Sequence, residues 1–345
     1  MTIKTRILAG RAVNPVGLGC MNLSHAYGQP PSPEDGVKLL RKALDLGVDH
    51  FDTAALYGFG RNEELVGPAL KDVRDNIVLV SKCGMQGVDG KRVIDGRPEA
   101  LRKTLEDSLR RLQTDRIDLY YLHRFDKLGG VPIEDSVGEM SRMVESGKVG
   151  AIGLSEVSAA TLLKAHKVHP IAAVQSEYSL WSRNAEIAVI EACAELGAAF
   201  VAFSPVARGF LAADNLDPSS FTEKDIRRGM PRFQEPHFSR NAALLPEFRR
   251  LAKEADCTPA QLALAWVLRT APHIHVIPGT TSVDHLEENM ASGGISLGAS
   301  IVERVDALIN QHTISGPRYP STTQAELDTA ESPGLESAHN HSPES

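Results

Sequence analysis

The stretch HFDTAALYGFGRNEELVG, residues 50–67, places an acidic residue and a tyrosine between a short apolar run and a charged segment. Asp52 ends the apolar run, and Tyr57 follows five positions later among small residues and glycines. A short apolar run, a turn and then a helix-like segment form the unit from which parallel sheets are built. The stretch therefore indicates a βα unit in which Asp52 and Tyr57 lie together beyond the end of the strand.

The same alternation repeats along the chain. Short apolar runs occur near Val16 and at residues 50–52, 76–82, 117–123, 149–155, 171–178, 199–204 and 274–279. Longer amphipathic segments lie between them, with helix-start signals at Ser32, Pro98 and Thr258. Eight such units predict an α/β fold, a (β/α)8 TIM barrel, with extra helices and long loops on its C-terminal rim.

A doubly wound open sheet is the alternative architecture. Its usual mark is a G-x-G-x-x-G sequence that follows the first strand and opens the first helix. The first turn of this chain, GLGCMNLSHAYG at residues 17–28, does not carry it. This difference favours the barrel.

The end of the chain differs in composition from the rest. From Thr313 onward it is rich in Ser, Thr and Glu, and it carries one arginine against five acidic residues. Such a composition is typical of segments that cannot bury enough apolar surface to fold. We therefore expect a barrel domain at residues 1–312 and a partly disordered acidic tail at residues 313–345.

Composition also limits the function. The net charge is -7, and no basic stripe interleaved with aromatics is found, so nucleic acid is not expected as a partner. No apolar run approaches the ~18 residues that a membrane span needs, which favours a cytoplasmic protein without a membrane partner. The four cysteines are far apart and form no CxxC pair, so no metal or redox site is predicted from them. The oligomeric state stays open.

Four polar residues lie at the ends of three consecutive predicted strands. Asp52 and Tyr57 follow the second strand, Lys82 ends the third and His123 ends the fourth. Barrel enzymes carry their catalytic groups at the C-terminal ends of the strands, where the βα loops converge. We therefore expect these four side chains, called the tetrad below, to face one another.

The tetrad suits proton donation to a carbonyl oxygen. A free tyrosine has a pKa of about 10, which a neighbouring ammonium such as that of Lys82 would lower. Asp52 would hold Lys82 in its charged form, and His123 would donate a hydrogen bond to the substrate oxygen. A proton donor in a fixed position contributes roughly 10²- to 10⁴-fold in rate.

Several segments in the same order resemble the aldo-keto reductase superfamily. They include HFDTAALYG, VLVSKCG, IDLYYLHRFD, GKVGAIGLSEVS, VQSEYSLWSR, FSPVARGFL and IPGTTSVDHLEEN, and the resemblance extends from Gly17 to about Asn310. Two of these segments, EYSLWSR and SPVARGFL, resemble the branch that includes perakine reductase and enzymes called pyridoxal reductases. The resemblance implies a reductase of aldehydes or ketones that uses NAD(P)H, with a small carbonyl or alcohol substrate.

The resemblance also implies which residues bind the cofactor. Ser155 and Gln175 would hold the nicotinamide carboxamide, and Phe203 would stack on the ring in place of a tyrosine. Glu156 stands where the superfamily has an asparagine. Further contacts are expected from Gly19, Met21, Asp52, Ser204, Val206, Arg208, Gly279, Thr280, His285, Glu288 and Asn289.

The adenosine end departs from the pattern that selects NADPH. Gly279, Thr280 and His285 stand where the superfamily has a lysine, a serine and an arginine, so two cations that would hold the extra phosphate are replaced, whereas Glu288 and Asn289 match. The sequence thus predicts NADPH/NADP+ and leaves NADH possible. Candidate substrate contacts are Met21, Ser24 and His25 in the first loop, Trp181 after the sixth strand, and residues of the loops near Met85 and Met230.

Two other functions stay open. Related barrels serve as cofactor-binding subunits without catalysis, acting as redox sensors. The HIH sequence at residues 273–275 could instead suggest a metal-dependent barrel hydrolase, but it precedes its strand and would lie on the rim opposite the tetrad. No metal is therefore predicted.

Overall fold

The computed structural model describes residues 3–213 and 216–331, and its centre is an eight-stranded parallel sheet. In the order of the sheet the strands are β12 (Ile274–Val276), β11 (Ala199–Phe203), β10 (Ile171–Glu177), β9 (Val149–Ser155), β8 (Ile117–Leu122), β5 (Val78–Cys83), β4 (His50–Asp52) and β3 (Leu18–Gly19). A parallel bridge between Val16 and Val276 joins the two edges and closes the barrel. The predicted (β/α)8 fold is confirmed, with a strand at each of the eight predicted positions.

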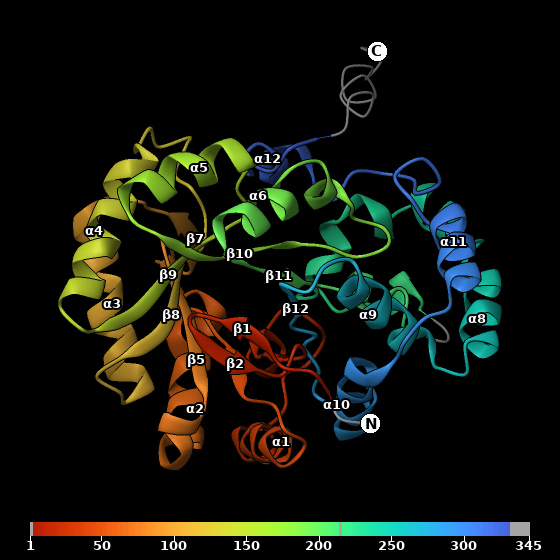
Figure 1. Cartoon of the computed structure of the whole chain (residues 1–345), viewed down its shortest axis with the longest axis horizontal. Helices are drawn as coiled ribbons and strands as arrows, with labels where there is room; N and C mark the ends of the chain where they lie inside the picture. Colours follow the sequence, from red (N-terminus) through yellow and green to blue (C-terminus); the bar gives the residue numbers. More distant parts are fainter. Residues whose placement is uncertain (1–2, 214–215, 332–345) are drawn as a thin grey trace.

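Helices surround this sheet (Figure 1). Those that follow the strands are α1 (Pro33–Asp45), α2 (Arg61–Leu70), α3 (Pro98–Leu112), α4 (Ile133–Glu145), α5 (Ala159–Val168), α6 (Val189–Leu196), α9 (Pro259–Arg269) and α10 (Val283–Ala291). The others are α7 (His237–Ala242), α8 (Leu245–Glu254), α11 (Ala299–Leu308) and α12 (Ser321–Gln324). Short 3-10 helices lie at Met21–Leu23, Tyr57–Gly60, Lys71–Asn76, Asn184–Glu186, Ala207–Gly209, Pro218–Ser220, Ile226–Gly229, Pro231–Phe233 and Ser292–Gly294.

The predicted helix starts have a clear local cause. The Ser32 side chain accepts a hydrogen bond from the backbone N–H of Asp35, and Pro33 begins α1. At α9, Thr258 and Gln261 form a reciprocal capping box, which satisfies two backbone donors that the helix itself leaves free. These helices therefore begin where the sequence predicted.

Two small hairpins cover opposite ends of the barrel. Strands β1 (Arg6–Leu8) and β2 (Arg11–Val13) lie where the parallel strands begin, and Leu8 and Val13 pack on barrel-interior residues such as Val78. Strands β6 (Met85–Val88) and β7 (Lys91–Ile94) form a hairpin directly after β5. This part of the predicted long loops on the C-terminal rim therefore has regular structure.

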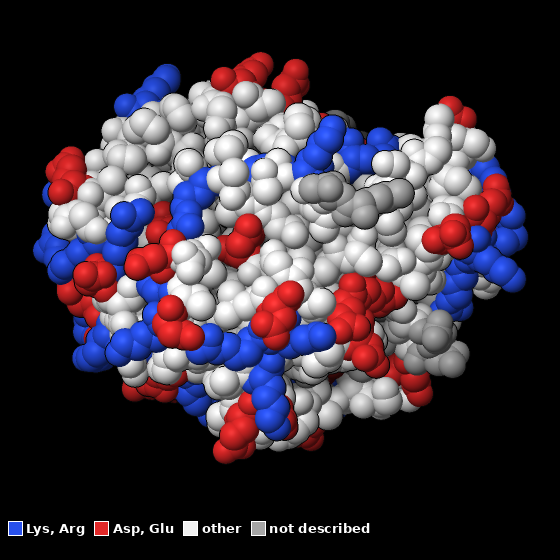
Figure 2. Space-filling model, turned by 60° about the horizontal axis from the view of Figure 1, so that its bottom comes forward, with Lys and Arg blue, Asp and Glu red and all other residues white. Residues whose placement is uncertain are grey.

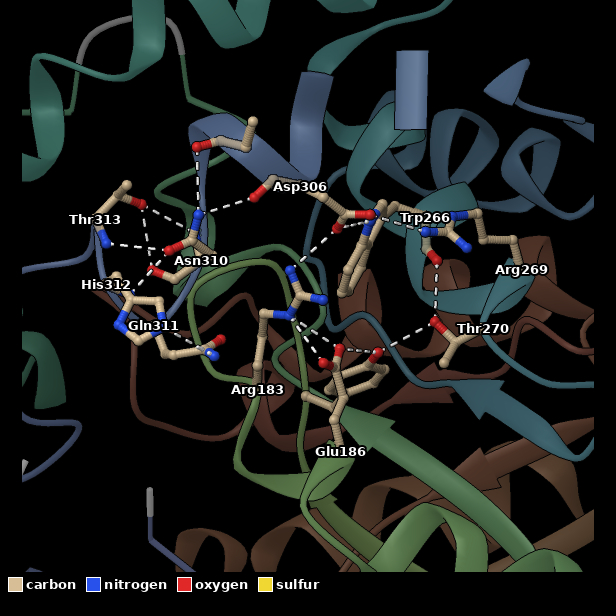
Figure 3. A network of polar contacts seen from close by, with 12 residues as sticks. Arg183, Glu186, Trp266, Arg269, Thr270, Asp306, Asn310, Gln311, His312 and Thr313 are labelled. Atoms are coloured by element: carbon tan, nitrogen blue, oxygen red, sulfur yellow. Dashed lines mark hydrogen bonds and ion pairs between the residues drawn. The ribbon is translucent and has the colours of Figure 1, made fainter. Parts of the chain in front are cut away.

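A polar network holds α11, which follows the last barrel strand, to the barrel (Figure 3). The carboxylate of Asp306 on α11 accepts bonds from Arg183 at 3.0 Å, from the indole N–H of Trp266 at 3.0 Å and from Arg269 at 3.2 Å. Arg183 also bonds Glu186 at 2.9 Å. One carboxylate thus joins α11 to α9 and to the loop after β10.

Residues 313–331, called the C-terminal segment below, differ from the expected tail. Arg318, Tyr319 and Leu327 are buried, and the segment forms α12. The carboxylate of Asp328 accepts from the backbone N–H of Ser158 at 3.1 Å, and the Asn184 side chain donates to a carbonyl of this segment at 3.0 Å. The segment contains few apolar residues, and many of its contacts with the barrel are polar. The rest of the expected tail, residues 332–345, lies outside the described residues.

The surface shows charges of both signs. On the face drawn in Figure 2, basic and acidic side chains lie close together. Several exposed pairs are in contact, for example Arg250 with Glu247 at 2.6 Å and Arg304 with Glu254 at 2.5 Å. Within the described part of the chain, no helix is long and apolar enough to cross a membrane.

Candidate active site

The structure brings the tetrad together at the C-terminal rim of the barrel. Asp52 ends β4, Lys82 lies near the end of β5 and His123 follows β8 directly. The Lys82 ammonium contacts the Asp52 carboxylate, lies 3.1 Å from the Tyr57 hydroxyl and donates to the Thr53 carbonyl at 2.9 Å. Tyr57 and His123 meet edge to face, with ring centroids 5.7 Å apart.

The turn after Tyr57 explains the glycines of the opening stretch. Gly58, Phe59 and Gly60 all have positive φ, at 57°, 56° and 94°, a backbone conformation that glycine adopts at least cost. At Gly58 a side chain would also lie 2.9 Å from the Ser24 side chain. The turn therefore reverses the chain at once and holds Tyr57 beside the end of β4.

Electrostatics keep Lys82 charged and Tyr57 protonated. Burial disfavours the ammonium of Lys82, but Asp52 and Tyr57 outweigh it and raise its pKa above the ordinary value. Burial also raises the pKa of Tyr57, and the lowering effect of Lys82 only partly offsets it. This differs from the expectation that the ammonium would lower the phenol's pKa overall, because burial is the largest cause and Asp52 opposes Lys82.

His123 is held in its neutral form. Burial, followed by the charges of Lys82 and Arg124, lowers the pKa of His123 well below its ordinary range. Its Nδ1 atom is buried and has no hydrogen-bond partner within the part of the chain that is described. Because His123 lines the cavity, its neutral imidazole can exchange a hydrogen bond with a bound oxygen.

A cavity of about 860 Å³ opens at the tetrad. It is lined by Asp52, Tyr57 and His123, whereas Lys82 lies behind them and is fully buried. All of the predicted cofactor residues line it, namely Gly19, Met21, Asp52, Ser155, Gln175, Phe203, Ser204, Val206, Arg208, Gly279, Thr280, His285, Glu288 and Asn289. The volume lies within the range of roughly 300–1,000 Å³ that is usual for small-molecule sites.

Of the residues expected near the nicotinamide, Ser155 and Gln175 lie at the cavity wall and Glu156 does not. Ser155 and Gln175 line the cavity, and the Gln175 amide donates to the second oxygen of Asp52 at 2.7 Å. Glu156 does not line it: its carboxylate accepts from the backbone N–H of Glu177 at 2.8 Å and from Arg318 at 2.5 Å. The residue that stands in place of the asparagine is therefore used to bind the C-terminal segment.

The predicted adenosine end lies at the start of α10. Ser282 caps this helix by accepting from the backbone N–H of His285, and the Thr280 hydroxyl accepts from the backbone N–H of Ser282 at 3.0 Å. The helix supplies a positive N-terminal end, which favours a phosphate, without the cations of the usual pattern.

Of the candidate substrate residues Ser24, His25 and Trp181, only His25 lines the cavity. His25 lines the cavity, and its ring centroid lies 5.7 Å from that of Tyr57. Ser24 does not line it, because its hydroxyl accepts from the Asn62 amide at 2.7 Å. Trp181 does not line it either: it is buried and stacks on Phe210 with centroids 4.7 Å apart. The structure thus gives no support to Ser24 or Trp181 as direct contacts.

The loops near Met85 and Met230 reach the cavity as predicted, since Met85 and Arg92 of the β6–β7 hairpin and Arg227 and Met230 of the long loop after β11 line it.

Other lining residues were not foreseen. Arg124 follows His123, and Tyr319 and Thr323 come from the C-terminal segment. Only Arg124 carried a signal in the sequence, since it directly follows a predicted catalytic residue.

The histidines of the HIH sequence lie away from this cavity. His275 is buried on β12, where its Nε2 lies 3.2 Å from the carbonyl of Ile7 and its ring meets that of His50 edge to face. Among residues 3–213 and 216–331, no group of three His, Cys, Asp or Glu side chains is placed to hold a metal ion. The four cysteines are free thiols.

Known proteins resemble this chain over most of its length. The family model described as "Aldo/keto reductase family" matches residues 15–310. A protein of Glycine max named probable aldo-keto reductase 1 is 40% identical over 313 residues, which cover 90% of this chain and 89% of that protein.

Solved structures show the same architecture. The glycerol dehydrogenase AKR11B4 of Gluconobacter oxydans is similar with a TM-score of 0.81 and 29% identity, covering 93% of this chain and 99% of that one. An aldo-keto reductase of Klebsiella pneumoniae in complex with NADPH is similar with a TM-score of 0.70 and 27% identity, covering 92% and 100% of the two chains. With the barrel, the tetrad and these likenesses together, the chain belongs to the aldo/keto reductase family and is an oxidoreductase.

Proposed function

We propose that this protein reduces aldehydes or ketones with NADPH and that Tyr57 donates the proton to the carbonyl oxygen. The observation that carries the proposal is the contact of the Lys82 ammonium with both Asp52 and the Tyr57 hydroxyl beside the cavity. A phenol, an ammonium and a carboxylate in this order can deliver a proton and stabilise the phenolate that remains.

The residues around the cavity fit a dinucleotide. Ser155 and Gln175 offer polar side chains, and Phe203 offers an aromatic face. The start of α10 offers a positive helix end for a phosphate. The NADPH-bound relative from Klebsiella pneumoniae supports NADPH as the cofactor. When bound, NADPH supplies the hydride that reduces the carbonyl carbon.

The chain's own groups then have distinct roles. Tyr57 keeps its proton at neutral pH because burial raises its pKa, so it is a donor and not a base at the start of the reduction. Lys82, 3.1 Å from the phenol oxygen, stabilises negative charge there as the proton leaves. Asp52 holds Lys82 charged, and neutral His123 donates a hydrogen bond that fixes the substrate oxygen.

The test is NADPH oxidation with a panel of aldehydes and ketones, followed by absorbance. Tyr57→Phe should lower kcat/KM by about 10²- to 10⁴-fold, because it removes the hydroxyl that donates the proton. Tyr120→Phe is the matched control, since Tyr120 is a buried tyrosine of β8 that does not line the cavity. Equal turnover in wild type and Tyr57→Phe would remove Tyr57 from the mechanism. Tight NADPH binding without turnover of any carbonyl would instead favour the redox-sensor alternative.

A further inference from the structure

Arg124, directly after His123, places a positive charge at the cavity wall. Its Nη1 donates to the His123 carbonyl at 2.8 Å and to the Ser155 hydroxyl at 3.4 Å. Its Nε is buried and has no hydrogen-bond partner within the described residues. Among those residues, no carboxylate lies within ion-pair distance of this guanidinium.

The other arginines that line the cavity are each neutralised. Arg92 pairs with Glu326 at 2.7 Å, and Arg208 pairs with Glu177 at 2.8 Å. Arg227 pairs with Asp225, also at 2.7 Å. Removing a charge from water is costly unless a partner compensates it. Arg124 therefore differs from its neighbours, because nothing that the structure describes supplies its anion.

The charge of Arg124 acts directly on the tetrad. After burial and Lys82, Arg124 is the next cause that lowers the pKa of His123. It also helps Lys82 to oppose the effect of burial on the pKa of Tyr57. These couplings place the guanidinium close to the point where a carbonyl oxygen would meet Tyr57 and His123.

The cofactor does not account for this cation. Arg124 bonds Ser155, which the proposed cofactor site assigns to the nicotinamide carboxamide, a neutral group. The proposed phosphate contact is the start of α10, which belongs to another part of the cavity wall. The compound that can bring a negative charge to Arg124 is thus the substrate.

We propose that Arg124 is a specificity-determining residue that binds an anionic group of the substrate, so that this reductase prefers carbonyl compounds carrying a carboxylate or a phosphate. The proposal rests on the proposed function and names the substrate class of that same site. A guanidinium suits such oxyanions because its planar N–H groups can donate two parallel bonds.

The first experiment compares three aldehydes with the same reacting group. They are 4-carboxybenzaldehyde, 4-formylphenyl phosphate and the neutral ester methyl 4-formylbenzoate. The wild type should favour one or both anions over the ester by about 10- to 100-fold in kcat/KM, as expected for a charge-assisted hydrogen bond. The stronger anion identifies carboxylate or phosphate as the natural group. No preference for either anion would overturn the proposal.

The second experiment changes the charge. Arg124→Met should abolish the preference, because it should lower kcat/KM for the anions by about 10- to 100-fold more than for the ester. Arg124→Lys should retain part of the preference because it keeps the charge. Arg116→Met is the matched control at the other end of β8, since Arg116 is exposed and lies away from the cavity. Equal losses on all three aldehydes would overturn the proposal.

Two binding measurements distinguish this proposal from a role of Arg124 in cofactor binding and from a failure of the proposed reduction. NADPH affinity, followed by fluorescence, should be the same in wild type and Arg124→Met, and a matching loss of NADPH affinity would assign Arg124 to the cofactor instead. Binding of benzoate and of neutral benzamide, followed by calorimetry, needs no turnover. Benzoate bound better than benzamide by wild type but not by Arg124→Met would support the anion site even if the proposed reduction failed. Equal binding of the two by wild type would count against it.

Discussion

Two clusters of buried charge lie at the same rim of the barrel, and they serve different ends. One is the tetrad. The other, called the anchoring cluster, consists of Glu156, Glu177, Arg208 and Arg318, all of them buried. Both contain ion pairs and both shift pKa values: Arg208 and Arg318 lower the pKa of Glu177 to about 2 even though burial would raise it. Neither burial nor a shifted pKa therefore tells the two clusters apart.

The difference lies in which groups face the cavity. In the anchoring cluster, the carboxylate of Glu177 accepts from Ser182 at 2.8 Å and from Arg208 at 2.8 Å, and that of Glu156 accepts from Arg318. Of this cluster only Arg208 lines the cavity, whereas Asp52, Tyr57 and His123 of the tetrad all line it. Structural ion pairs perturb pKa values as catalytic groups do. Exposure to the cavity, and not a shifted pKa, is therefore what marks the proposed reactive cluster.

The largest expected effect comes from Lys82→Met. It removes the cation that stabilises the phenolate, so kcat/KM should fall by about 10²- to 10⁴-fold, measured by steady-state NADPH oxidation. Asp52→Asn should give a smaller loss, because Lys82 stays in place but loses its carboxylate partner. Activity of Lys82→Met within tenfold of wild type would contradict the roles assigned to the tetrad.

Arg318→Met tests the anchoring cluster. It leaves the buried carboxylate of Glu156 without its cation, and breaking a buried pair in this way costs about 3–5 kcal/mol of unfolding free energy. The measurement is urea unfolding of the whole chain. Arg250→Met, which removes an exposed ion pair, should cost much less unfolding free energy and is the control. Equal stability of the two variants would show that the cluster does not anchor the segment.

Acid should weaken the same cluster. The folded-state pKa of Glu177 is about 2, below its ordinary value of 4.5, so the stability it contributes is present above pH 4.5 and is lost as the pH falls toward 2. The shift corresponds to about 3 kcal/mol. Urea unfolding at several pH values should therefore show a steeper loss in this window for wild type than for Glu177→Gln. Parallel curves would contradict the assignment.

The smallest expected effect on catalysis is that of Trp181→Phe. Because Trp181 packs on Phe210 and does not line the cavity, KM for carbonyl substrates should stay within about twofold of wild type. Unfolding free energy should fall by about 1–3 kcal/mol through lost packing. His25→Ala, at the cavity wall, should raise KM. A raised KM in Trp181→Phe without a change in His25→Ala would reverse these assignments.

The features that depend on neighbouring residues could be predicted from the sequence. Strand ends, glycines and helix caps are short-range features, and they were enough to predict the barrel and to place Asp52, Tyr57, Lys82 and His123 on consecutive strand ends. The cofactor residues came from the resemblance, and all of them line the cavity. Their roles in binding stay predictions until a cofactor is measured.

The sequence missed what depends on distant partners. Arg318 and Glu156 are 162 positions apart, and neither position gives a sign of the other. The composition of the C-terminal segment was typical of disorder, because polar anchoring has no apolar periodicity. The direction of the Tyr57 pKa shift could not be predicted either, because it depends on how far the folded chain buries the phenol.

The C-terminal segment is also the last part of the site to be synthesised. The tetrad is complete in the chain by residue 123, but the wall of its cavity includes Tyr319 and Thr323. A growing chain on the ribosome thus holds its reactive groups long before it can enclose a substrate. A shortened protein ending at residue 312, where composition suggested a boundary, would keep every strand of the barrel and lose both that wall and the arginine that neutralises Glu156.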